Sequence, residues 1–168
     1  MRRAILTAIP LLGLTLLLQL SIISRMKLLS GNADLMLLVL AGWGLQERAR
    51  GAWLFGVAAS LLVGTVSGVP WYIYLVGYLS VVGMARLLIH RIWQAPLLAM
   101  FTVTLIGTLE MLMLTYIQQT IFETALSLSE VLLQIVLPSV LLNLLLAIPI
   151  HAMIKDLTNR LYPAEVAE

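Results

Sequence analysis

The chain has 168 residues, of which 61% are hydrophobic and 11% are charged, and its formal net charge is +2. Soluble domains average about 45–50% apolar and about 25% charged residues, so this composition excludes an ordinary soluble domain and indicates an integral membrane protein. The sequence contains no cysteine, which excludes disulfides, thiolate metal sites and cysteine nucleophiles.

Six apolar segments predict an all-α membrane protein with six transmembrane helices, forming one domain over residues 1–168. They are Ala4–Ile23, Leu35–Leu45, Gly51–Val69, Pro70–Ile89, Ala95–Ile117 and Val131–Ile154. The first follows Met1-Arg2-Arg3 like a signal peptide, but no small-residue cleavage site follows it, so we expect an uncleaved spanning helix.

The second segment is too short to span a bilayer as a helix. Its 11 residues rise only about 16 Å, whereas a spanning helix needs about 17–25 residues. This segment must recruit Ala33 and its neighbours, be accommodated by a thinned bilayer, or re-enter the membrane.

The third segment carries a ladder of small residues at every fourth position: Ala52, Gly56, Ser60, Gly64 and Gly68. On a helix these positions form one nearly continuous groove. In lipid, small residues allow helix backbones to approach closely, which supplies van der Waals contact. The ladder predicts either tight packing within this protein's own bundle or a docking groove for a partner's helix.

Glu110 is the one ionisable residue well inside a predicted span, the fifth. A carboxyl group there should face the protein interior, be paired, or be protonated. The sixth span offers Gln134 and Asn143 near the same depth, and Pro138 cannot donate to the Gln134 carbonyl oxygen. We therefore expect Glu110 to lie against the sixth helix as a neutral, structural residue. An ion relay and a contact with a partner are the alternatives.

Catalytic, metal and cofactor sites are not predicted. His90 and His151 lie at the ends of the fourth and sixth spans without a nearby acid, which favours solvation at the interface. No serine has a suitably placed base, and no glycine-rich loop is present to hold phosphate.

The outer connection Gln118–Glu130 places Ile121, Phe122, Ala125 and Leu126 at about one-turn spacing. This pattern predicts a short interfacial helix that rests on lipid or on a neighbouring protein.

The basic residues predict that both termini are cytoplasmic. That orientation places eight of them inside, namely Arg2, Arg3, Arg48, Arg50, Arg86, Arg91, Lys155 and Arg160. Only Arg25 and Lys27 then lie outside, in agreement with the positive-inside rule. Aromatic residues agree, since Trp43, Trp53 and Trp93 fall at the predicted inner interface.

The last span carries a family resemblance. Pro138, an Asn five residues later (Asn143), and Ala147 and Pro149 before a basic end resemble the C-terminal helix of the rod shape-determining protein MreD family. The run Arg48-Ala49-Arg50 before a small-residue helix ending in Ser67-Gly68-Val69-Pro70 is similar to that family's third span and turn. Asp34 before a short Leu-rich second span also fits, whereas Gly64 lies near a position at which members often carry an acid.

The resemblance implies a non-catalytic subunit of the bacterial cell-elongation (rod) complex in the cytoplasmic membrane. Such a subunit would bind MreC, lie near RodA, the class B penicillin-binding transpeptidase and MreB, and support peptidoglycan synthesis and cell shape. It would bind no cofactor and no nucleic acid.

The family also resembles the six-helix substrate-binding subunit of energy-coupling-factor vitamin transporters, which supplies an alternative function. Those subunits dock their partner through an Ala-xxx-Ala pattern on the first helix, and Ala4 and Ala8 satisfy it. Gln118, Gln119 and Glu123 are the best polar groups that the outer connection offers to a vitamin.

Overall fold

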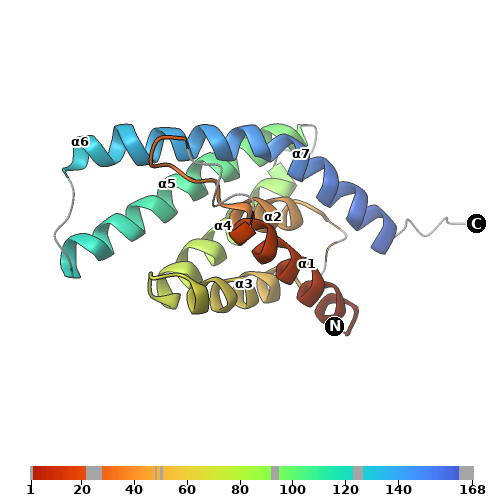
Figure 1. Cartoon of the computed structure of the whole chain (residues 1–168). Helices are drawn as coiled ribbons and strands as arrows, with labels where there is room; N and C mark the ends of the chain where they lie inside the picture. Colours follow the sequence, from red (N-terminus) through yellow and green to blue (C-terminus); the bar gives the residue numbers. More distant parts are fainter. Residues whose placement is uncertain are drawn as a thin grey trace, which may run out of the picture.

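A computed structural model describes residues 2–21, 28–47, 49, 51–91, 95–122 and 127–162. Within these ranges the chain is helical and contains no strand. The elements are α1 (Arg2–Ser21), α2 (Leu35–Gly44), α3 (Ala52–Val66), α4 (Trp71–Arg91), α5 (Pro96–Phe122), α6 (Leu128–Val131), the π-helix η2 (Leu132–Val136) and α7 (Leu137–Leu161). Figure 1 shows that α6 and α7 follow one another along one side of the bundle.

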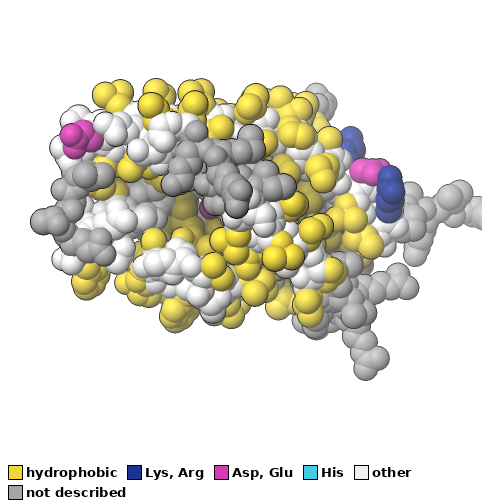
Figure 2. Space-filling view, viewed as in Figure 1, with side chains coloured by type: hydrophobic (Ala, Val, Ile, Leu, Met, Phe, Trp, Pro, Cys, Tyr) yellow, Lys and Arg dark blue, Asp and Glu magenta, His cyan; other side chains and the backbone are white. Residues whose placement is uncertain are grey.

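Three helical stretches among the described residues are long and apolar enough to cross a membrane: Trp71–Ile89, Pro96–Phe122 and Leu128–Leu161. Shorter apolar helices cover Ile9–Ser21, Leu35–Gly44 and Ala52–Val66. The protein is therefore embedded in a membrane. Figure 2 agrees, since hydrophobic side chains are spread over the described surface between an acidic end at α6 and a charged end where α7 finishes.

α2 lies at the centre of the bundle, and all ten of its residues are buried. It packs against α1, α3, α4, α5 and α7. A helix that is apolar on every side is stable only when it is surrounded, which explains a Leu-rich segment without an amphipathic pattern. Trp43 is fully buried in α2 and stacks on Phe55 of α3, with ring centroids 4.5 Å apart. The Trp43 ring therefore packs inside the bundle, and its place at the inner interface stays a prediction about depth.

The predicted ends of the last two spans differ from the observed ones. α5 continues to Phe122, so residues 118–122 belong to a long helix and not to a separate interfacial one. Ile121 and Phe122 are exposed at its end, whereas Glu123, Ala125 and Leu126 lie outside the described residues. The sixth segment continues beyond its predicted end, to Leu161.

Candidate functional site

The segment between α1 and α2 forms the most elaborate polar site among the described residues. Residues 28–31 form a tight turn, in which the Leu28 and Gly31 N–H groups each donate to the other residue's carbonyl oxygen, and residues 32–34 then lead along α7 to the start of α2. The backbone N–H groups of Ser30, Asn32 and Asp34 each donate to a different acceptor there, at 3.1, 3.1 and 2.7 Å. The acceptors, in order, are the Gln134 carbonyl oxygen, Ser139 Oγ and Asn143 Oδ1.

The spacing of these contacts follows from the geometry of the two elements. Alternate N–H groups of an extended chain point to the same side. From residue 32 to residue 34 an extended chain advances about 6.6 Å, and from residue 139 to residue 143 an α-helix advances about 6 Å. The two rows of partners therefore match for the Asn32 and Asp34 contacts, whereas Ser30 reaches the Gln134 carbonyl oxygen from the turn.

Pro138 makes the first of these contacts possible. It has no N–H group with which to satisfy the Gln134 carbonyl oxygen one turn earlier. Ser30 donates to this oxygen instead. The sequence therefore identified the free acceptor correctly but assigned it the wrong donor, since Glu110 does not reach it.

Gly31 allows the turn to lie directly on the helix. A Cβ atom at this position would be 2.7 Å from both Pro138 Cβ and the Ser139 backbone nitrogen. Neither atom can move without displacing a helix backbone. The close approach therefore requires glycine at position 31.

Asp34 ends the extended segment and begins α2. Its carboxylate accepts a hydrogen bond from the Leu37 N–H (3.0 Å) as a helix N-cap. The Tyr78 hydroxyl of α4 donates to the same carboxylate, at 3.2–3.3 Å from its two oxygens. Asp34 thus joins the start of the central helix to the middle of α4.

Gln19 and Thr108 complete the network from two other helices. The Gln19 side-chain amide donates to the Ala33 carbonyl oxygen (3.1 Å) and accepts from the Leu35 N–H (2.7 Å). Asn143, which accepts from Asp34, donates through Nδ2 to Thr108 Oγ1 of α5 at 2.9 Å. We call this set the polar latch: residues 30–35 with Gln19, Tyr78, Thr108, the Gln134 carbonyl, Pro138, Ser139 and Asn143.

The polar latch satisfies backbone groups that lipid could not. An unpaired N–H or C=O group at membrane depth is costly, so non-helical backbone there must be buried in protein or line an aqueous cavity. The latch supplies partners for these backbone groups from α1, η2 and α7, and Tyr78 of α4 and Thr108 of α5 bond to the side chains of Asp34 and Asn143. Its described members can hold the fold together, but they include no nucleophile paired with a base.

The small-residue ladder of α3 packs inside this bundle. Cβ atoms added at Gly56 and Gly64 would meet Leu79 and Trp71 of α4, at 3.1 and 2.5 Å. Ala52 and Ser60 are buried, whereas Gly68 has open space around it. Internal packing thus accounts for the ladder as far as Gly64, and the groove is already occupied by α4.

Glu110 does not lie where the sequence predicted. Its carboxyl oxygen Oε2 forms a hydrogen bond of 2.5 Å with Ser80 Oγ of α4. Asn143 bonds to Asp34 and Thr108 instead, and the Gln134 side chain is exposed. The prediction matched residues of neighbouring helices by their depth in the membrane. Depth does not determine whether the Glu110 side chain points from α5 toward α4 or toward α7.

His151 also differs from expectation, because it is buried in α7 and its Nδ1 has no hydrogen-bond partner among the described residues. The side chain of His90 lies outside the described ones. Pro149 lies inside α7 and is exposed. In the described part of the chain, no three His, Asp or Glu side chains lie close enough together to hold a metal ion.

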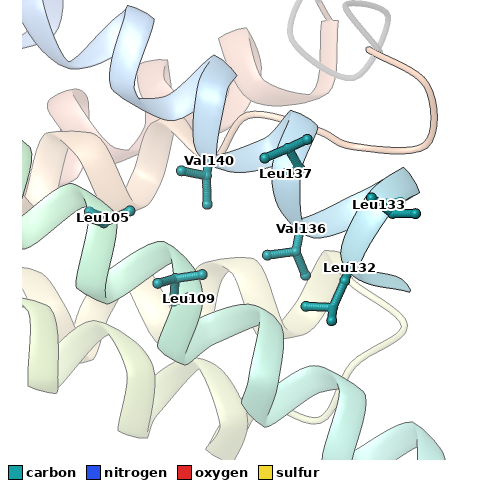
Figure 3. Close-up of a pocket in the computed structure, with 7 residues that line it drawn as sticks. All are labelled: Leu105, Leu109, Leu132, Leu133, Val136, Leu137 and Val140. Carbon is teal, nitrogen blue, oxygen red and sulfur yellow. The ribbon is translucent and has the colours of Figure 1, made fainter. Parts of the chain in front are cut away.

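A shallow groove opens between α5 and the η2–α7 helix (Figure 3). Its volume is about 330 Å³, and its lining is entirely aliphatic. The lining residues are Leu105, Leu109, Leu132, Leu133, Val136, Leu137 and Val140. This surface suits a lipid chain or an apolar helix and offers no polar group to a ligand.

Several members of the polar latch were not predicted. Gln19, Tyr78 and Thr108 look like isolated polar residues in apolar helices, and only their convergence on residues 33–35 and 143 gives them a role.

Comparison with known proteins identifies no relative: no protein-family model, no curated protein and no solved structure matches the chain.

Proposed function

We propose that the chain is a non-catalytic subunit of the bacterial cell-elongation complex, similar to MreD, that binds MreC. The observation that carries this proposal is the convergence of three of the motif residues on which the resemblance rests, namely Asp34, Pro138 and Asn143. Asp34 and Asn143 are joined by a hydrogen bond, and Pro138 frees the acceptor used by Ser30. Positions more than 100 residues apart in the sequence thus act as one structural unit, as expected of a family signature.

The proposal includes six membrane crossings with both termini in the cytoplasm of a bacterial cell. The second crossing would combine an extended half with a helical half. Residues 31–34, which lead from the turn to α2, contribute about 13 Å and the ten residues of α2 contribute about 15 Å. Their sum of about 28 Å is close to the ~30 Å thickness of the hydrocarbon core.

In this function the protein acts by binding other membrane proteins. MreC is the proposed direct partner, and RodA, the class B penicillin-binding transpeptidase and MreB belong to the wider complex. The groove of Figure 3 and the exposed faces of the helices are surfaces suited to such contacts.

The proposal is tested by co-purification of the full chain from detergent after co-expression with MreC. We expect a stoichiometric complex that survives size-exclusion chromatography. Recovery of the chain without MreC, or with the ATPase-bound membrane subunit of a transporter, would contradict the proposal.

One observation favours the alternative, a vitamin-binding subunit of an energy-coupling-factor transporter. A row of polar groups leads from the turn after α3 to Asp34. Ser67 Oγ lies 2.6 Å from the Tyr74 hydroxyl, and the rings of Tyr74 and Tyr78 lie 5.6 Å apart. Saturable binding of a vitamin by the purified chain would support transport in place of complex assembly.

A further inference from the structure

Glu110 and Ser80 form a polar pair on the seam between α5 and α4, at the surface of the bundle. Both side chains are partly exposed. Ser80 Oγ lies 2.5 Å from Glu110 Oε2 and 2.9 Å from the Gly77 carbonyl oxygen of its own helix. The second carboxyl oxygen, Oε1, has no hydrogen-bond partner among the described residues.

The proton count of this pair shows what Glu110 can still bind. A serine hydroxyl carries one proton and two acceptor sites. The single Ser80 proton can point to the Gly77 carbonyl oxygen or to Glu110 Oε2, and both oxygens lie within hydrogen-bond distance of Ser80 Oγ. In either case Glu110 Oε1 remains as an acceptor that no described side chain uses.

The fold alone does not account for a carboxyl group at this position. Ionisable residues in spanning helices are costly and usually face the protein interior, a water-filled cavity or a partner. Ser80 does not need Glu110, because it has an acceptor in its own helix. Removing the carboxyl group would therefore leave no buried donor without a partner.

The surroundings of the pair are apolar and exposed. Ile106 and Met113 lie about one turn before and after Glu110 on α5, and Val76 lies one turn before Ser80 on α4; all three are exposed. The seam therefore presents the Glu110 carboxyl group among exposed apolar side chains, in a helix long enough to lie in lipid, which supplies no water.

We propose that the Glu110–Ser80 pair is the binding site for the transmembrane helix of a partner. This helix is apolar and donates one hydrogen bond to Glu110 from an amide or hydroxyl side chain. This inference rests on the proposed function and adds to it the helix face that the partner contacts. An amide or hydroxyl donor complements the Glu110 oxygen that has no partner among the described residues, and the exposed apolar residues around it complement the rest of the helix.

The test measures binding of full-length MreC to the full chain by energy transfer in phosphatidylethanolamine–phosphatidylglycerol liposomes. Glu110→Leu should weaken binding about threefold to tenfold, the effect expected from one interhelical hydrogen bond. Glu110→Gln should bind like the wild type, since its amide retains a carbonyl oxygen and can donate to Ser80. Thr102→Val is the matched control on α5, because Thr102 donates to its own helix at Leu98, and it should bind like the wild type.

Thermal unfolding of each variant in detergent, without MreC, separates this role from a structural one. Glu110→Leu should unfold at or above the wild-type temperature, whereas a lower temperature would overturn the proposal in favour of internal stabilisation. Equal MreC binding by wild type and Glu110→Leu would also overturn it. If two copies of this chain associate and Glu110→Leu weakens that association instead, the occupant is a second copy and the proposed partner is wrong. Absence of MreC binding by the wild type would overturn the proposed function together with this partner.

Discussion

At the scale of single residues, the polar latch depends on side chains that each satisfy backbone groups of another segment. Asn143 joins the Asp34 N–H to the Thr108 hydroxyl, and the Gln19 amide joins Ala33 to Leu35. Buried backbone groups must find partners somewhere. In the segment before α2, where no helix can supply them, side chains from other helices do so.

Asn143→Ala should destabilise the protein by removing an acceptor and a donor at once. It leaves the Asp34 N–H and the Thr108 hydroxyl without their partner, and an unsatisfied buried group costs about 1–3 kcal/mol. We expect a lower thermal unfolding temperature in detergent. Asn159→Ala is the control, because Asn159 is an exposed residue of the same helix, and it should leave the temperature unchanged. Equal unfolding temperatures for both variants would show that the Asn143 bonds contribute nothing.

Gly31→Ala should destabilise the protein for a steric reason. The added methyl group would overlap Pro138 and Ser139, including backbone atoms. Overpacking of this kind typically costs about 1–3 kcal/mol. Gly13→Ala on α1 is the matched control, since its Cβ would meet nothing within 4 Å. An unfolding temperature of Gly31→Ala at or above that of Gly13→Ala would contradict the close approach of residue 31 to α7.

At the scale of elements, the α3–α4 pair shows how small residues determine packing. The glycines of the ladder face different atoms of α4: Gly64 faces the Trp71 Cα and Cβ atoms, Gly56 faces the end of the Leu79 side chain, and Gly68 faces open space. A backbone atom cannot move aside, whereas the end of a leucine side chain can. The ladder is therefore not uniform in its tolerance of larger residues.

Alanine substitutions along the ladder should consequently follow a fixed order. We expect Gly64→Ala to lower the unfolding temperature most, Gly56→Ala to lower it less, and Gly68→Ala to leave it near the wild-type value, because the tight approach lies at Gly64. Measuring all three in the same detergent makes Gly68→Ala the internal control. A larger effect at Gly68 than at Gly64 would refute internal packing of the ladder.

The limits of sequence reasoning are visible in the same elements. Apolar runs located every long helix, because hydropathy is a local property. The free carbonyl oxygen at Gln134 was also predictable, since it follows from Pro138 alone. The partner of Glu110 was not, because depth in a helix leaves the direction around its axis undetermined. The burial of Trp43 depends likewise on α2 lying at the centre, which only the assembled bundle establishes.

At the scale of the whole molecule, the orientation in the membrane depends on whether the second segment crosses. Residues 30–34 lie beside residues 134–143 of the long helix Leu128–Leu161, so α2 begins near the middle of that helix. From this point α2 runs alongside α7 in the same direction, since Asp34 pairs with Asn143 and Gly42 lies against Ile154. Together the two halves have about the length of one crossing.

We therefore expect Gln46 and the C-terminus to lie on the same side as the N-terminus, and the connection after α5 to lie on the other. The basic residues independently favour the cytoplasm for that first side. Reporter fusions after Gln46, within residues 118–130 and at Glu168 measure these positions. We expect the fusions after Gln46 and at Glu168 to report the cytoplasmic side, and the fusion within residues 118–130 to report the outer side. The fusion after Gln46 is decisive, because without a second crossing it would lie outside. In that case the number of crossings would be odd, and the C-terminal fusion would also move outside. An outer location for both would overturn the half-extended crossing while leaving the contacts of the polar latch unchanged.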